Sequence, residues 1–474
     1  MSAAPTTLAQ PRARARAAAA LAAYLGALLA LTWALPLWLD ELLQLLVTRD
    51  PDSASRLAEI HRTPGAVPLG YEVQRLAIHW LGYSVFTARF PSEVASVLAL
   101  AGLLLLAREI GTRGLVFVGV VWAVIPLLLR YAVEARPYSL ALLFSIASTA
   151  LLFRILRDPE ARWVLLYAAC VAAGLYTQPF SVFLQIGLLA PLVFERRTSA
   201  ERRTLASCAA SLLAGVLLLA PWVLSSSHNW RTYAHGMDEH FSLPGKLPLL
   251  LLRELSGGGY VCSLSLLAFV AMGCLSKRAA GLLKLQLLSG AACCIALALA
   301  CDAVFNYFFA IRQVIPALVP LCLLAGEGWA EARTRWGTYP GLALLAVLVS
   351  GSLVKNVRHF RDHSEEWALA AQRLERSSRD GCVMYLPADM PGLYEFFAPD
   401  LKQERCGAAP AADNVLVPVT KYSVPAEIRL ASDRLASRGY RAMEIQRVCE
   451  AIGIQRYQKG GPSGEPAPHR IIRE

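Results

Sequence analysis

The chain has 474 residues, of which 56% are hydrophobic and only 17% are charged, a balance too apolar for a soluble protein of this length. Its net charge of +11 does not indicate a nucleic-acid partner, because the basic residues fall largely in short segments between long apolar stretches. The composition therefore predicts a polytopic α-helical membrane protein that binds no nucleic acid.

The apolar stretches predict about eleven membrane spans, each requiring roughly 20 mostly apolar residues. Arg12, Arg14 and Arg16 precede the first stretch, so the positive-inside rule places the N-terminus in the cytoplasm. That stretch is too long for a cleaved signal peptide, and we expect it to be retained. The predicted spans lie near residues 17–39, 92–107, 114–129, 137–154, 163–177, 180–194, 205–224, 260–275, 282–301, 312–324 and 340–354.

With an odd number of spans, everything after residue 354 lies outside the cytoplasm. The sequence thus predicts a basic cytoplasmic N-terminus (1–16), a transmembrane domain (17–354) and an extracytoplasmic domain (355–474) of a multi-pass protein in the inner (plasma) membrane. Inside the transmembrane domain, the first outer loop (40–91) contains two amphipathic segments, near 50–62 and 69–82. A second outer loop, Ser225 to Leu247, contains Arg231 and His235.

The extracytoplasmic domain has an α/β pattern. We predict helices near 364–378, 390–397 and 425–438, strands near 382–386, 414–419 and 440–446, and a disordered tail from Gly460 to Pro468. No nucleotide-binding motif or metal-ligand cluster occurs in this sequence, which favours a structural or acceptor-contacting role over catalysis.

Eleven cysteines occur without metal-type spacing, and eight of them lie in or beside apolar spans, where a small hydrophobic side chain suits packing between helices. The other three are Cys382, Cys406 and Cys449. An extracytoplasmic domain permits one disulfide with one thiol left over, and the preferred pair is Cys382 with Cys406.

Three groups of charged residues fall at the outer ends of predicted spans: Asp40-Glu41, the run from Glu134 to Tyr138, and Arg312-Gln313. Charged groups at membrane depth are costly and usually functional. Each group also has a simpler explanation, namely a solvated helix end, a local ion pair between Glu134 and Arg136, or an interfacial anchor at Arg312. Because the topology places all three at one end of the bundle, we expect them to converge there.

These residues together resemble a known family. An Asp-Glu pair after the first span, Arg89-Phe90-Pro91-Ser92, the Glu-Ala-Arg-Pro-Tyr run, an arginine opening a late span and an outer C-terminal domain are similar to the GT-C fold glycosyltransferases. The most similar group comprises the protein O-mannosyltransferases, the lipid A aminoarabinose transferase and related lipopolysaccharide-core glycosyltransferases. The resemblance covers about residues 17–355. It implies that a sugar is transferred with inversion from a polyprenyl-phosphate donor to an acceptor. The donor lies among the membrane lipids, and the acceptor is an extracytoplasmic glycan, lipid or protein.

The resemblance also implies roles for individual residues. Asp40 would be the general base, and Glu41 would orient Asp40, bind the acceptor or ligate a divalent cation. Many relatives have His-Pro-Pro-Leu where this chain has Thr63 to Leu69, so either His61 or Arg62 could face the phosphate. Arg89 and Pro91 are expected to be structural. The predicted donor-phosphate ligands are Arg62, Arg136 and Arg312, supported by His61, Glu134, Tyr138, Arg231 and His235, and the candidate ligands for a divalent cation are Asp40, Glu41 and Glu134.

Two other classes of function compete with this reading. A secondary transporter or flippase would show an internal repeat and polar residues near mid-membrane. A non-catalytic scaffold of envelope assembly would not need Asp40. Among enzymes, an oligosaccharide polymerase or ligase would use the later outer loops for catalysis.

Overall fold

The structure, a computed structural model, describes the chain except for residues 1–10, 64, 196–197, 242–246, 278–279, 306–309, 387–390, 407–409, 411, 422 and 461–474. The side chains of residues 11–17, 227–241, 247–248, 305 and 444 also lie outside the described part. The chain divides into two compact units. Unit 1 comprises Met1–Thr32 with Asp50–His359, and unit 2 comprises Trp33–Arg49 with Phe360–Glu474.

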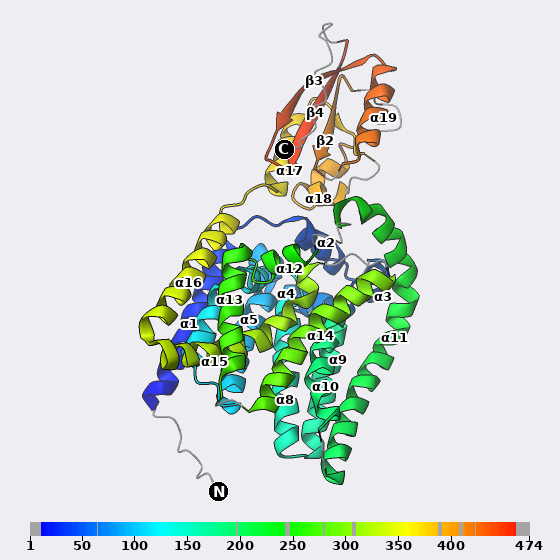
Figure 1. Cartoon of the computed structure of the whole chain (residues 1–474). Helices are drawn as coiled ribbons and strands as arrows, with labels where there is room; N and C mark the ends of the chain where they lie inside the picture. Colours follow the sequence, from blue (N-terminus) through cyan, green and yellow to red (C-terminus); the bar gives the residue numbers. More distant parts are fainter. Residues whose placement is uncertain are drawn as a thin grey trace. The chain divides into compact units, whose positions relative to one another are not determined.

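Unit 1 is an α-helical bundle (Figure 1). It contains α1 (Pro11–Thr32), α3 (Ser53–Arg62), α4 (Pro68–Leu81), α5 (Val85–Glu109), α6 (Leu115–Val124), α7 (Pro126–Ala132), α8 (Tyr138–Arg157), α9 (Ala161–Thr177), the 3-10 helix η1 (Pro179–Ser181), α10 (Val182–Val193), α11 (Ser199–Phe241), α12 (Leu247–Glu254), α13 (Gly259–Leu275), α14 (Gly281–Phe305), the 3-10 helix η3 (Ile311–Ala317), α15 (Leu318–Trp336) and α16 (Thr338–Phe360).

The helices of unit 1 confirm the predicted multi-pass membrane protein. Among the described residues, six helices are long and apolar enough to cross a membrane, and the bent pair α6 and α7 would make a seventh. Four shorter apolar helices accompany them: Ala18–Thr32, Ala161–Thr177, Pro179–Val193 and Gly259–Leu275. These segments lie where the sequence predicts spans. The two amphipathic segments of the first outer loop are also present, as α3 and α4.

Three predicted boundaries were wrong. The first span ends at Thr32 rather than at residue 39, because the chain must leave the helical conformation before Pro36. The third span is not continuous, since α6 and α7 meet at an angle of 66° where Pro126 begins the second helix. The predicted outer loop after Ser225 is instead the end of α11, which remains helical to Phe241.

The bend at Pro126 sets the direction of α7, which leads directly into the turn that contains Glu134. Asn356 of α16 donates a hydrogen bond from Nδ2 to the Val124 carbonyl at 2.9 Å, and the Leu127 N–H reaches the Ser256 carbonyl at 3.0 Å. These contacts satisfy backbone groups near the break, which an apolar environment requires. The bend is therefore held by α16 and by the turn between α12 and α13.

Unit 2 is a small α/β domain with the helix α2 (Leu39–Thr48) added to it. Its sheet has the order β1-β2-β4-β3, with β1 parallel to β2 and the other neighbours antiparallel. All seven residues of the inner strand β2 are buried. The elements after α16 are α17 (Trp367–Ser378), β1 (Cys382–Val383), α18 (Pro391–Glu395), the 3-10 helix η4 (Pro399–Lys402), β2 (Asn414–Thr420), α19 (Pro425–Ala436), β3 (Tyr440–Arg447) and β4 (Ile452–Lys459).

The sequence located these elements apart from α2, η4 and β4, and the predicted tail from Gly460 to Pro468 lies almost wholly outside the described residues. Unit 2 differs from the predicted outer domain in one respect: Trp33–Arg49, which carries Asp40 and Glu41, groups with the C-terminal residues rather than with the bundle.

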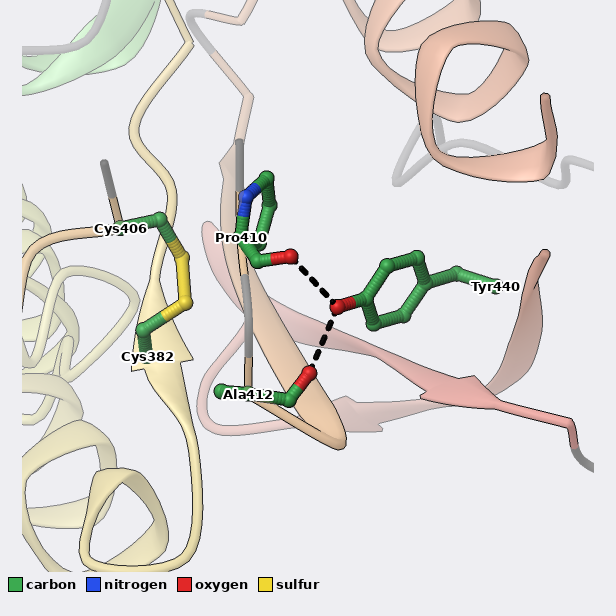
Figure 2. The surroundings of a disulfide bond; sticks show 5 residues. All are labelled: Cys382, Cys406, Pro410, Ala412 and Tyr440. Atoms are coloured by element: carbon green, nitrogen blue, oxygen red, sulfur yellow. Dashed lines mark hydrogen bonds between the residues drawn. A yellow bond between two sulfur atoms is a disulfide. The ribbon is translucent and has the colours of Figure 1, made fainter. Parts of the chain in front are cut away.

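The predicted disulfide between Cys382 and Cys406 is present, and Cys449 is a free thiol. Figure 2 shows the disulfide beside the segment that Tyr440 holds, where the tyrosine hydroxyl lies 3.0 Å from the Pro410 carbonyl oxygen and 2.6 Å from that of Ala412. Both half-cystines pack against the core of the sheet.

The α13–α15 contact yields a first prediction. A Cβ at Gly328 would overlap the Phe269 carbonyl oxygen, so Gly328→Val must separate the two helices and should cost about 1–3 kcal/mol. Thermal denaturation of the purified protein in detergent would measure this as a clear loss of stability. Gly26→Ala in α1 is the control, because a Cβ there meets nothing within 4 Å. Equal melting temperatures for the two variants would contradict the close packing.

The disulfide yields a second prediction. It closes a loop of 24 residues, and the chain-entropy argument gives such a crosslink about 3 kcal/mol. Replacing Cys382 and Cys406 together by alanine should therefore accelerate hydrogen exchange of β2 and β4 in the full-length protein. Cys449→Ala, which removes a cysteine of unit 2 that forms no disulfide, should leave those strands as protected as in the wild type.

Candidate functional site

The acid pair lies in the first turn of α2 in unit 2, and its two carboxylates have different surroundings. Glu41 is fully buried and accepts a hydrogen bond from the Trp38 N–H at 3.3 Å, whereas Asp40 is only half-buried. Successive helical residues point about 100° apart. Glu41 therefore faces back to the helix start, while Asp40 is the more accessible carboxylate.

In unit 1, the turn between α7 and α8 carries Glu134 and Arg136. Glu134 is buried, and its Oε1 lies 2.6 Å from Nε of Arg130 one helical turn earlier. The guanidinium of Arg136 lies over the ring of Tyr138, 5.8 Å from its centroid. Arg130 was missed in the sequence analysis, although its spacing of four residues from Glu134 is a recognised signal for an ion pair.

Helices α4 and α5 hold this turn in place. Ser92 donates a hydrogen bond to the Arg136 carbonyl at 2.8 Å, and Gln74 donates one to the Ala135 carbonyl at 3.4 Å. Gly70 lies directly against Pro137, where no larger residue fits without movement. Helices α4 and α5 thus fix the backbone from which Arg136 projects.

Arg312 joins the same region from η3, which packs against α8 and η1. It is half-buried, and its charge acts on the Tyr131 hydroxyl together with the charges of Arg130 and Glu134. The rings of Tyr131 and Tyr138 are 4.5 Å apart. We call this group the Tyr131 cluster; it consists of Arg130, Tyr131, Glu134, Arg136, Tyr138 and Arg312.

The Tyr131 cluster has an excess of positive charge, because three arginines accompany one carboxylate. Glu134 pairs with Arg130, and the guanidinium groups of Arg136 and Arg312 add two further positive charges to the cluster. Guanidinium groups in a partly buried, aromatic setting suit a phosphate, since the planar fork can donate two parallel hydrogen bonds.

His61 and Arg62 lie at the end of α3 and point in different directions. His61 Nε2 is 2.7 Å from the Ser225 hydroxyl, and the His61 ring meets the Trp222 ring edge-on at 5.3 Å. Arg62 pairs with Glu59 at 3.2 Å, and its side chain is 71% exposed.

The remaining predicted residues have the following positions. Arg89 is buried and donates a hydrogen bond to the Thr32 carbonyl at 2.8 Å, as a structural residue would. Arg231 and His235 lie on the helical backbone of α11, but their side chains are outside the described part. Within the described ranges, no group of three or more His, Cys, Asp or Glu side chains could hold a metal ion. The candidate set of Asp40, Glu41 and Glu134 thus gains no support as a metal site.

Comparisons with known proteins add two findings. Residues 64–224 match the family model described as dolichyl-phosphate-mannose-protein mannosyltransferase. This range includes Glu134, Arg136 and Tyr138 and leaves Asp40 and Arg312 outside. No curated protein matches the sequence.

Solved structures are similar to the chain over most of its length. ArnT from Cupriavidus metallidurans in the apo state matches with a TM-score of 0.51 and 12% identity, over 82% of this chain and 87% of that one. The same protein bound to undecaprenyl phosphate matches with a TM-score of 0.50 and 13% identity, over the same shares. An Archaeoglobus fulgidus oligosaccharyltransferase matches with a TM-score of 0.49 and 12% identity, over 86% of this chain and 67% of that one. The predicted GT-C fold is confirmed.

The Tyr131 cluster predicts binding of a lipid with a phosphate headgroup. Arg312→Ala should weaken binding of a lipid with a phosphate headgroup about tenfold or more, because a hydrogen bond to a charged group contributes about 1.5–3 kcal/mol. Native mass spectrometry of the purified protein with added lipid would measure this. Arg154→Ala is the matched control. Arg154 lies in the last turn of α8, the helix that begins at Tyr138, and it pairs there with Asp158. Equal losses for both variants would contradict a specific phosphate site.

Proposed function

Because the chain is a multi-pass membrane protein with the GT-C glycosyltransferase fold, we propose that it transfers a sugar from a polyprenyl-phosphate donor to an extracytoplasmic acceptor, with inversion at the anomeric carbon. The observation that carries the proposal is the Tyr131 cluster, a partly buried set of arginines suited to a phosphate. The description of the matched family and the undecaprenyl phosphate bound to ArnT support the class of donor.

In the proposed reaction, an acceptor oxygen forms a bond to the anomeric carbon as the bond from that carbon to the phosphate oxygen breaks. The products are the glycosylated acceptor and the free polyprenyl phosphate. Negative charge grows on the leaving phosphate in the transition state, and fixed cations lower the barrier by stabilising it. Arg136 and Arg312 take this role, and Tyr138 orients Arg136 through its ring.

Asp40 acts as the general base that accepts the proton of the acceptor hydroxyl. A base must be accessible to the proton it removes, and Asp40 is the more exposed member of the acid pair. Glu41 has a supporting role, since it is buried and bonded to the helix start.

His61 and Arg62 are assigned lesser roles than the sequence suggested. The contact of His61 with Ser225 and Trp222 suits a residue that holds α3 against α11. Arg62 remains a candidate for early capture of the donor headgroup, because an exposed cation attracts an anion without binding it tightly.

We further propose that the protein lies in the inner membrane with its N-terminus in the cytoplasm and unit 2 outside. The disulfide supports this orientation, since disulfides persist in oxidising compartments. The basic inner loops agree with it: Arg157 contacts Glu109, and Arg113 contacts Glu327, at the ends of helices predicted to face the cytoplasm.

Asp40→Asn tests the proposed function. Loss of a general base typically costs about 10²–10⁴-fold in rate, so the variant should fail to restore the sugar that a deletion strain lacks. Lipidomic and glycan analysis of the host envelope, with and without the gene, would identify that sugar. Asp50→Asn, which changes a partly exposed carboxylate shortly before α3, should restore it fully. Restoration by correctly inserted Asp40→Asn at the wild-type level would overturn the base assignment.

A further inference from the structure

The helix that carries the acid pair is built into the C-terminal domain. Trp33–Arg49 groups with Phe360–Glu474 as one compact unit. Within that unit α2 packs on α18: Leu46 lies against Gly392, and the Arg49 guanidinium lies 5.2 Å from the centroid of the Phe396 ring. The position of Asp40 therefore depends on residues more than 300 positions later in the chain.

Glu365 makes the contact nearest to Asp40. Its Oε2 accepts a hydrogen bond from the Leu39 N–H at 3.0 Å, across 326 residues of sequence. The same oxygen accepts one from the Trp367 indole N–H at 3.3 Å, and Oε1 lies 2.8 Å from Lys421 Nζ. Glu365 is itself buried, so each of these contacts offsets the cost of removing its charge from water.

The contact supplies what the local sequence lacks. The first N–H groups of a helix need acceptors, and a serine, threonine, asparagine or aspartate usually provides one at the preceding position. That position in α2 is Trp38, whose indole accepts no hydrogen bond from the backbone. Glu41 bonds the Trp38 N–H, and Glu365 bonds the next one, at Leu39. A carboxylate is also favoured there by the helix dipole.

We propose that Glu365 is a positioning residue, which fixes the first turn of α2 and thereby the orientation of Asp40. The inference rests on the proposed function, in which Asp40 is the base. It gives the C-terminal domain a direct part in the reaction, in place of the structural or acceptor-contacting role expected from its sequence. Lys421 and Trp367 are part of the same arrangement, because both contact the Glu365 carboxylate that bonds to the Leu39 N–H.

Glu365→Ala tests the inference. Loss of the Glu365 carboxylate should displace Asp40 and lower kcat about 10- to 100-fold, because a displacement of about 1 Å at a reacting group has an effect of that size. The KM for the donor should stay close to the wild-type value, because Arg136 and Arg312 belong to unit 1. Glu365→Gln keeps an oxygen for the Leu39 N–H and should recover most of the lost kcat. Glu395→Gln, which removes a carboxylate paired with Arg405 in the same unit, should leave kcat unchanged.

Hydrogen exchange of the full-length protein provides a readout that needs no substrate. Glu365→Ala should raise exchange in the peptide that covers α2, with β2 and β4 protected as in the wild type. Wild-type kcat in Glu365→Ala, beside an inactive Asp40→Asn, would overturn the positioning role alone. Exchange rising throughout unit 2 would overturn it as well, since the defect would then be general unfolding. If the wild type transfers no sugar, the proposed function fails, while the exchange result still decides whether Glu365 holds α2.

Discussion

A carboxylate removed from water costs several kcal/mol unless donors or a cation replace its hydration, and this requirement governs the helix ends of the protein. Glu134 is buried and paired with Arg130, while Glu41 and Glu365 are buried and bonded to N–H groups at the start of α2. Glu93 of α5 is fully buried and accepts from Thr32 at the end of α1. Glu365 and Glu93 thus join segments that are distant in the sequence, whereas Glu41 and Glu134 bond to residues three and four positions earlier.

The same requirement accounts for the division of chemistry between the two units. In unit 1, Glu134 pairs with Arg130, and Arg136 and Arg312 bring further positive charge to the Tyr131 cluster. In unit 2, burial of Glu41 and Glu365 fixes α2 and leaves Asp40 as the accessible carboxylate. A sugar transfer with a phosphate leaving group needs both a fixed cation and an accessible base.

The sequence predicted what depends on local pattern. The apolar spans, the amphipathic helices α3 and α4, the strands β1 to β3 and the cysteine pair all follow from hydrophobic period, length or compartment. It missed what depends on distant partners. Helix α2 is short and relies on Glu365 for an N-terminal cap, and β4 gains its place by pairing with β2 and β3. Four residues of the Tyr131 cluster were predicted from the topology: Glu134, Arg136, Tyr138 and Arg312. Arg130 was identified only from its ion pair with Glu134.

The most direct test of this account is a cryo-electron microscopy structure of the full-length protein with undecaprenyl phosphate added. The account predicts phosphate density within about 3–4 Å of the Arg136 and Arg312 guanidinium groups, the range of a charge-assisted hydrogen bond or ion pair. A phosphate bound instead at the surface beside Arg62, or at the opposite end of the bundle near Arg113, would contradict it.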